Sequence, residues 1–307
     1  MRKRIAVIAN AGARACAGGD VAETLKAAFA KQGAEPTIHL VCDGSKLTET
    51  AQAAIDAGCD VLVAAGGDGT VSAVAAVAAQ AGVTLGVLPL GTLNHFAKDV
   101  GLPQTLDAAA AVVVEGIERE VDLGEVNGRV FINNSSLGLY PSVVRRREGH
   151  QRLGRSKWSA FARAAWTVMG RYPLVHVTIE ADGRRLRRST PLVFIGNNDY
   201  RIAGLQLGTR AALDSGLLAV YVTRDVGRWR LTMFALRALF GRLREKQDFD
   251  VLQTDAVTID LKDRQVRVAT DGEVTRIDAP LEYRIRPRAL KVVVPAAAEE
   301  PDVPAAA

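Results

Sequence analysis

The 307-residue sequence lacks several features that mark common protein classes. Its three cysteines, Cys16, Cys42 and Cys59, form neither a CxxC pair nor a metal-ligand pattern with histidine, which favours reduced cysteines in the cytoplasm. No segment approaches the ~18 uninterrupted apolar residues of a membrane span. The apolar stretch after the basic start is interrupted at Asn10 and is too short for a signal peptide. We therefore expect a soluble cytoplasmic protein, or one peripheral at the inner face of the membrane.

Two common nucleotide-binding signatures are also missing. The sequence contains no P-loop lysine motif and no GxGxxG. The net charge of +5 suits anionic partners such as nucleotides or acidic lipid surfaces. We expect no nucleic-acid partner, because no recognised nucleic-acid-binding motif is found. Nothing in the sequence predicts the oligomeric state.

The first third of the sequence alternates strand and helix patterns. Apolar strands are predicted at residues 5–9, 36–41, 61–65 and 84–88, with helices at 20–32, 45–57, 70–81, 93–100 and 105–115. Short, continuously apolar strands separated by helices indicate a parallel sheet covered on both faces. We therefore predict an α/β domain at residues 1–125.

The pattern changes after residue 118, where strand-like runs become longer and closer together. Several contain Asn-Gly or Asp-Gly, the strongest short-range signal of a β-hairpin. These runs predict an antiparallel β domain at residues 126–295, interrupted by helical stretches at 157–170 and 226–244. The last strand, 290–294, could return to the first sheet. Residues 296–307 form a low-complexity tail that we expect to be disordered.

A glycine-rich turn, Gly66-Gly67-Asp68-Gly69-Thr70, separates a predicted buried strand from a predicted helix. Glycine allows the backbone to approach a ligand closely, and the amides at a helix N-terminus suit a phosphate. A bare carboxylate repels phosphate, so Asp68 would act through Mg²⁺ or accept a hydrogen bond from the nucleotide or the acceptor. The alternative is a tight strand–helix turn in which Asp68 only caps the helix.

A second turn follows the next predicted strand. It contains Pro89, Gly91 and Thr92 and leads into a helix that Thr92 or Asn94 would cap. Ligands of open parallel sheets bind at the carboxyl ends of the strands, so both turns could face one crevice. Ordinary helix capping is the alternative.

The two turns together resemble the diacylglycerol kinase catalytic domain. The motif is residues 66–70, followed by Pro89-Leu90-Gly91-Thr92-Leu93-Asn94 and Phe96-Ala97, and it is similar to the soluble bacterial lipid kinases of the diacylglycerol/sphingosine kinase superfamily. The resemblance runs to about residue 295. It implies a Rossmann-like, NAD kinase-like α/β domain and a C-terminal antiparallel β-sandwich. It also implies a kinase that uses ATP and Mg²⁺ to phosphorylate a hydroxyl of diacylglycerol or a related lipid.

The resemblance assigns nucleotide contacts to three segments. The family's first-strand loop begins at Asn10, although Ala11 and Arg14 replace the usual proline and final glycine. The implied nucleotide-binding residues are Asn10, Gly66, Gly67, Asp68, Gly69, Thr70, Val71, Gly91, Thr92 and Asn94. His95 stands where many members carry aspartate, so it is either functional or a surface residue of a helix.

A third candidate site lies in the β domain, at Asp271-Gly272-Glu273. On its own this is a hairpin turn, and Asn at position 271 should then keep stability within about 0.5 kcal/mol. The resemblance instead makes Asp271 the general base, helped by Glu273, with Asp68 as a third catalytic carboxylate. It also suggests a structural Mg²⁺ at Asp214, although Ser215 replaces the usual second carboxylate.

Two basic amphipathic segments, residues 145–173 and 228–246, could contact an anionic membrane or simply cover a core.

Two functions other than a lipid kinase stay open from the sequence. One is an NAD kinase, which shares the glycine turn but not the second turn as it stands here. The other is a non-catalytic lipid-binding or regulatory protein on the same fold. The identity of the acceptor lipid is not predicted.

Overall fold

The computed structural model describes residues 3–12, 20–138, 174–203, 206–210, 212–223 and 249–296. Cys16, the predicted helical stretches at 157–170 and 226–244, and nearly all of the predicted tail lie outside these residues. So do both amphipathic segments, at 145–173 and 228–246. The described chain forms two compact units. The first runs to Val121 and resumes at Arg288, and the second is Asp122–Pro287.

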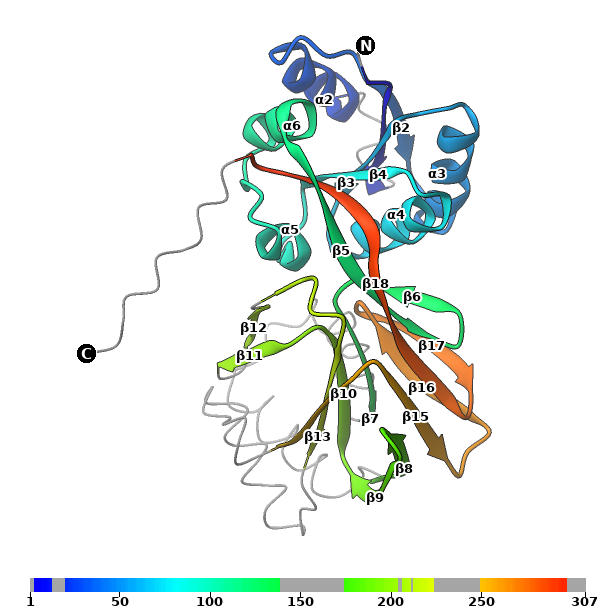
Figure 1. Ribbon diagram of the computed structural model, residues 1–307. Helices are drawn as coiled ribbons and strands as arrows, with labels where there is room; N and C mark the ends of the chain where they lie inside the picture. The colour runs from blue at the N-terminus through cyan, green and yellow to red at the C-terminus, as the bar shows by residue number, and fades with distance from the viewer. Residues whose placement is uncertain are drawn as a thin grey trace, which may run out of the picture. The chain divides into compact units, whose positions relative to one another are not determined.

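The first unit contains a parallel sheet with the strand order β2-β1-β3-β4-β18 (Figure 1). Its strands are β1 (Ile5–Asn10), β2 (Thr37–Val41), β3 (Val61–Gly66), β4 (Thr84–Pro89) and the end of β18 (Leu281–Val294). β18 joins this sheet where Val292 pairs with Leu85, while its beginning pairs with β15 in the second unit. The predicted parallel sheet is confirmed.

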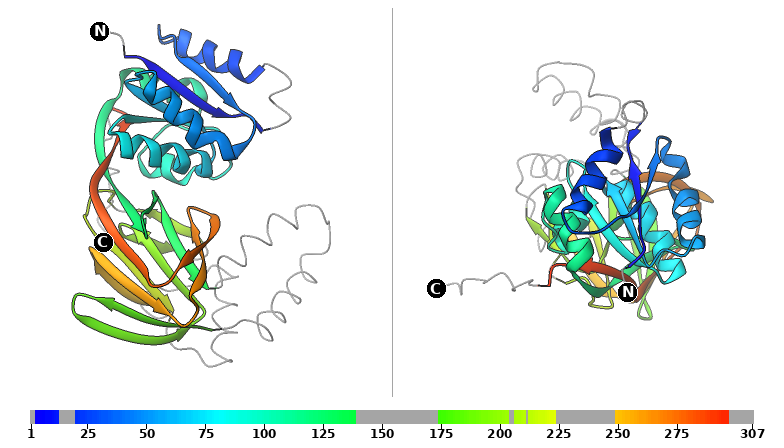
Figure 2. Two further views of the ribbon diagram at one scale, coloured as in Figure 1. Left: turned by 90° about the vertical axis from the view of Figure 1, so that its right-hand side faces the viewer. Right: turned by 90° about the horizontal axis from the view of Figure 1, so that it is seen from above.

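Helices cover both faces of this sheet, with α2 and α6 on one face and α3 and α4 on the other (Figures 1 and 2). The helices are α2 (Asp20–Ala30), the 3₁₀ turn η1 (Gly44–Lys46), α3 (Leu47–Asp56), α4 (Asp68–Ala81), α5 (His95–Asp99) and α6 (Leu106–Glu115). Most lie within two residues of the predicted bounds. α5 is shorter than predicted because Asn94 has a φ of 52°, a left-handed conformation that a helix cannot continue through.

The core of the first unit explains why β4 carries a glycine in its middle. Val63 of β3 and Val113 of α6 are fully buried and both lie against Gly86. A Cβ atom at Gly86 would lie 2.9 Å from a methyl group of Val63 and 3.2 Å from one of Val113. The missing side chain therefore allows α6 to pack closely on the sheet, as tight interior packing requires.

The second unit is an antiparallel β-sandwich. One sheet has the order β14-β13-β10-β7-β16-β17, and the other contains the beginning of β18 with β15, β8 and β9, joined by β5 and β6. The strands are β5 (Ile117–Val126), β6 (Arg129–Phe131), β7 (Asn134–Gly138), β8 (Val175–Ala181), β9 (Arg184–Thr190), β10 (Leu192–Asn197), β13 (Leu218–Thr223), β14 (Phe249–Thr254), β15 (Ala256–Leu261), β16 (Gln265–Thr270) and β17 (Glu273–Asp278). A separate pair is β11 (Tyr200–Ala203) with β12 (Gln206–Arg210). Buried residues of both sheets form one core.

The hairpins of the second unit form where the sequence predicts them. Asn127-Gly128, Asp182-Gly183 and Asp271-Gly272 connect β5 to β6, β8 to β9 and β16 to β17. All six residues have φ between 45° and 89°, as a type I′ turn requires at its two central positions. The predicted antiparallel domain is thus confirmed together with its turn chemistry.

The cysteines differ from the prediction. Cys42 is disulfide-bonded, whereas Cys59 is a free thiol, so the prediction of reduced cysteines is wrong for Cys42. Spacing along the sequence could not show this, because a disulfide depends on distance in space.

Within the described ranges, no helix combines the length and the apolar character needed to cross a membrane.

Candidate functional site

The glycine-rich turn lies at the carboxyl end of β3, where the chain enters α4. Gly67 is the N-cap residue and is extended, with φ −86° and ψ −176°, and Asp68 is the first helical residue. The alternative in which Asp68 caps the helix is therefore wrong. A Cβ atom on Gly66 would lie 2.6 Å from Thr70 Oγ1, so only glycine fits above the buried threonine.

Asn10 joins this turn from the end of β1. Its Nδ2 donates a hydrogen bond to Thr70 Oγ1 at 3.2 Å, and its Oδ1 accepts one from the Gly12 amide at 3.3 Å. Adjacent parallel strands bring both segments to the same edge of the sheet. The structure thus brings Asn10 together with the glycine turn.

The second turn packs directly on the first. The Leu90 amide donates to the Gly66 carbonyl at 3.0 Å. A Cβ atom on Gly91 would lie 2.4 Å from the Cα atom of Gly67, so the two glycines allow the backbones to touch. This contact joins the two predicted nucleotide segments into one surface within the first unit.

Asn94 braces the second turn instead of capping α5 with its side chain. It occupies the N-cap position, but its side chain forms no capping hydrogen bond with the described first turn of the helix. Its Nδ2 instead donates to the carbonyls of Pro89 and Gly91 at 3.2 and 3.0 Å and to Gln104 Oε1 at 3.2 Å. Thr92 and His95 are exposed, and His95 is the first residue of α5.

One carboxylate oxygen of Asp68 is buried without a hydrogen-bond donor among the described residues. Asn94 Oδ1 is likewise buried and accepts no hydrogen bond from the residues that the structure describes. An unsatisfied buried acceptor costs about 1–3 kcal/mol. The position of Asp68 in the first turn of a 14-residue helix offsets part of this cost, since the helix dipole favours a negative charge there. Asp68 therefore offers an acceptor that a bound donor or cation would satisfy.

At the glycine-rich turn, Asp68 is the carboxylate that could bind Mg²⁺. The described residues contain no group of three or more His, Cys, Asp or Glu side chains arranged around a metal position. This fits Mg²⁺, which is commonly held by one or two carboxylates together with substrate phosphates. Asp68, with its unsatisfied oxygen, is the residue of the first unit that would hold it.

Asp271 in the second unit has the opposite environment. Its Oδ2 accepts a hydrogen bond from the Ile132 amide at 2.8 Å. Its Oδ1 accepts bonds from the amides of Asn133 and Asn134 at 2.8 and 3.1 Å. The Asp271 amide in turn donates to the Asn134 carbonyl at 2.9 Å. Three amides stabilise the negative charge of this carboxylate, so Asp271 is more than a turn residue.

Buried polar side chains support the segment that binds Asp271, and the sequence analysis missed them. Arg210 and Asn197 donate to the Ile132 carbonyl at 2.6 and 2.9 Å, and the Tyr200 hydroxyl donates to the Asn133 carbonyl at 3.0 Å. A signal was present in the sequence. Two asparagine pairs, at 133–134 and 197–198, follow strongly apolar strands, and buried polar groups require partners.

The other predicted residues of this unit are at the surface. Glu273 is exposed at the start of β17, opposite Thr270. Asp214 is also exposed, and the buried carboxylate of that region is Asp122, which is 2% exposed. Asp122 Oδ2 accepts hydrogen bonds from the Gly216 amide at 2.7 Å and Asn198 Nδ2 at 2.8 Å.

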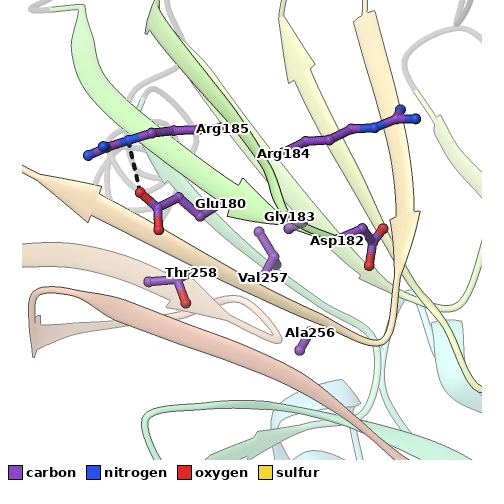
Figure 3. A pocket seen from close by; sticks show the side chains of 9 residues that line it. Glu180, Asp182, Gly183, Arg184, Arg185, Ala256, Val257 and Thr258 are labelled. Atoms are coloured by element: carbon purple, nitrogen blue, oxygen red, sulfur yellow. Dashed lines mark ion pairs between the residues drawn. The ribbon is translucent and has the colours of Figure 1, made fainter.

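A shallow hollow of about 430 Å³ lies beside the β8–β9 hairpin (Figure 3). Figure 3 shows the Arg185–Glu180 ion pair at its rim, with Nε 2.9 Å from Oε1. Its lining includes Asp182, Arg184 and Thr258, but none of the residues predicted for the site. We therefore consider two candidate sites, one at the two turns of the first unit and one at Asp271 in the second unit.

Comparison with known proteins assigns both units. Residues 4–126 match the diacylglycerol kinase catalytic domain, and residues 138–294 match the YegS C-terminal NAD kinase beta sandwich-like domain. A diacylglycerol kinase of Bacillus subtilis is 26% identical over 249 residues, which cover 80% of this chain and 81% of the relative. A protein of Pseudomonas aeruginosa named "Probable lipid kinase YegS-like" is 31% identical over 210 residues, or 65% and 67% of the two chains.

A crystal structure of a diacylglycerol kinase from Bacillus anthracis has the same fold. Its TM-score is 0.67 at 19% identity, and the alignment covers 95% of this chain and 97% of that one. At this identity the likeness concerns the fold alone. The matches in sequence cover nearly all of both units, including the glycine turns and Asp271. The chain belongs to the diacylglycerol kinase catalytic domain family, with the YegS-type β-sandwich as its C-terminal domain.

Proposed function

We propose that this member of a kinase family is an ATP-dependent lipid kinase that phosphorylates a free hydroxyl of diacylglycerol or a related lipid. The observation that carries the proposal is the contact of the two glycine turns beside Asp68. Glycine at positions 67 and 91 lets the two turns touch, the N-terminus of α4 is adjacent, and one oxygen of Asp68 lacks a donor among the described residues. These are the features that a polyphosphate and its cation require.

The first unit would hold the nucleotide. The amides at the start of α4 and the exposed hydroxyl of Thr92 would bind phosphate oxygens, while Asn10 fixes Thr70 beneath the turn. Mg²⁺, when bound with the nucleotide, would neutralise phosphate charge. The role of Asp68 is to supply the carboxylate oxygen on the protein side of that cation.

The second unit would act on the acceptor. Asp271 Oδ2 accepts the amide of Ile132, and an ionised carboxylate is also a group that can take the proton of the lipid hydroxyl. As the hydroxyl oxygen bonds to the γ-phosphorus, the bond from that phosphorus to the ADP oxygen breaks and the hydroxyl proton moves to Oδ2. Glu273, two residues on, is exposed and could orient the acceptor.

The test uses γ-labelled ATP with diacylglycerol in mixed micelles, with NAD⁺ and without an acceptor. We expect label in the lipid product, loss of transfer in Asp68→Asn and in EDTA, and normal transfer in Asp20→Asn, an exposed aspartate of α2. Label in NADP⁺ would make the protein an NAD kinase. ATP binding without transfer to any of a series of hydroxyl lipids would favour the non-catalytic alternative.

A further inference from the structure

Arg210 is a buried arginine whose guanidinium binds the segment that holds Asp271. It is the last residue of β12 and is 7% exposed. Its Nη1 donates to the Ile132 carbonyl at 2.6 Å and to the Asn197 carbonyl at 3.3 Å, and its Nη2 donates to Asn133 Oδ1 at 3.1 Å. A guanidinium stays charged at all physiological pH values, and burying it is costly. The position of this charge therefore calls for an explanation.

Buried side chains fix two of the three peptide groups that bind Asp271. The Ile132 carbonyl, which Arg210 contacts, belongs to the same peptide plane as the Asn133 amide, which donates to Asp271 Oδ1. Because donation to a carbonyl polarises its amide, the guanidinium strengthens this bond to the carboxylate. Arg210 and Asp271 thus interact through one peptide group.

The next peptide plane is supported in the same way. The Tyr200 hydroxyl donates to the Asn133 carbonyl at 3.0 Å, and the amide of that plane, from Asn134, donates to Asp271 at 3.1 Å. The Arg210 guanidinium lies 5.7 Å from the centre of the Tyr200 ring, a cation–π contact. The two side chains therefore hold both planes from their carbonyl sides.

We propose that Arg210 is a positioning residue that sets the orientation and proton affinity of Asp271 through residues 132–134. This rests on the proposed role of Asp271 as the base. Removing the cation removes part of what stabilises the ionised carboxylate, so Asp271 binds a proton more readily. The acid limb of kcat/KM then moves to higher pH, by about 0.5–1 pH unit for the loss of one charge-assisted hydrogen bond.

The experiment compares Arg210→Lys and Arg210→Met with the wild type, using Arg187→Met as the control. Arg187 is an exposed arginine of β9 in the same unit. We expect kcat for the lipid to fall about 10- to 100-fold in Arg210→Met, with partial recovery in Arg210→Lys, since a misplaced base loses general-base catalysis. The Kd for ATP should not change, because the nucleotide residues belong to the first unit. Arg187→Met should match the wild type.

A second measurement separates this inference from the proposed function. Asp271 is identified in carboxyl ¹³C spectra of the labelled full chain by its absence in Asp271→Asn, and is titrated in the wild type, in Arg210→Met and in Arg210→Lys. An upward shift of its titration supports the positioning role even if Asp271→Asn stays active, a result that would overturn only the role of Asp271 as base. A wild-type titration and acid limb in a folded Arg210→Met protein overturn the inference. If Arg210→Met does not fold, Arg210→Gln, which removes the charge and keeps an amide donor, replaces it in both measurements.

Discussion

The two candidate sites each contain an aspartate that is followed by glycine, and these two aspartates have opposite surroundings. Asp68 opens a helix in the first unit, and one of its oxygens is buried without a donor among the described residues. Asp271 forms a hairpin turn in the second unit, with φ of 48°, and both of its oxygens accept backbone hydrogen bonds. The same dipeptide thus yields one carboxylate with an oxygen that meets no donor in the described part of the chain, and one whose two oxygens both accept backbone hydrogen bonds.

This difference separates two ways of building a functional carboxylate. The free energy of the folded protein is raised by the unsatisfied oxygen of Asp68, and a bound ligand can recover that cost. The bonds to Asp271 stabilise the fold before any ligand arrives. Substitution of either residue should therefore lower activity, but only substitution of Asp271 should markedly lower stability.

Asp271→Asn should have the largest effect on rate. Asparagine cannot accept the acceptor's proton, so kcat should fall by about 10²–10⁴, the usual contribution of a general base. The substitution also places an NH₂ group against backbone amide donors, so stability should fall by about 1–3 kcal/mol. Steady-state kinetics and urea unfolding measure the two effects.

The three amide bonds change the stability expected of Asp271→Asn, which appeared benign when only the sequence of the hairpin turn was considered. Glu273→Gln is the matched control, because Glu273 is exposed and two residues away. Its stability should stay within about 0.5 kcal/mol of the wild type. Equal stability of Asp271→Asn and wild type would show that the three amide bonds contribute nothing to the fold.

The sequence predicted this hairpin but not the contacts of its aspartate. Asp271-Gly272 between alternating valines specifies the turn through local chemistry. Its amide partners are 137 to 139 residues away, and no local pattern reports such a pairing. The buried position of Arg210 was hidden for the same reason. Charged residues are almost always exposed, so burial of one is a property of the fold.

The first unit was predicted more completely because its signals are local. Continuous apolar runs specified β1, β3 and β4, and glycines marked both turns. The exception is Asn94, for which sequence reasoning predicted a helix cap. Its side chain is instead held by the turn behind it, at the carbonyls of Pro89 and Gly91. The choice between these partners depends on how the turn packs, which propensity does not encode.

Gly91→Ala tests the contact between the two turns. The new Cβ atom would lie 2.4 Å from Gly67 Cα, and backbone cannot move aside as a flexible side chain does. We expect a loss of about 1–3 kcal/mol in stability, the usual cost of overpacking, and weaker ATP binding in calorimetry. Gly44→Ala is the control, because a Cβ atom there meets nothing within 4 Å. Unchanged ATP affinity in Gly91→Ala would show that the second turn does not take part in nucleotide binding.

Tyr283 tests how fully the polar groups near Asp271 are satisfied. Its buried hydroxyl lies 3.0 Å from Ser135 Oγ on β7, and Ser135 pairs with Thr270 beside Asp271. Burial raises the pKa of Tyr283 well above its ordinary value near 10, and the Ser135 hydrogen bond opposes this only in part.

The sign of the pH effect follows from this raised pKa. Above pH 10 the unfolded chain releases the phenolic proton while the folded chain keeps it, so stability falls as pH rises, by up to about 1.4 kcal/mol per pH unit. Tyr283→Phe removes this contribution. Urea unfolding at pH 9, 10 and 11 should therefore show a steeper alkaline loss for the wild type than for Tyr283→Phe. If stability falls equally with pH in the two proteins, the Tyr283 hydroxyl is accessible to water in the folded protein.

Asp68→Ala should have the smallest effect on stability, and the size of that effect is the sharpest test of the contrast. The substitution removes a buried acceptor without a described donor, which stabilises the protein, and a favourable charge at the start of α4, which opposes the gain. The two effects nearly cancel, so we expect a change within about 0.5 kcal/mol, together with loss of phosphate transfer. Saturating Mg²⁺ and ATP should then stabilise the wild type more than the variant in thermal unfolding. A loss of stability as large as that of Asp271→Asn would mean that Asp68 already has a partner in the fold, and the two carboxylates would no longer differ in kind.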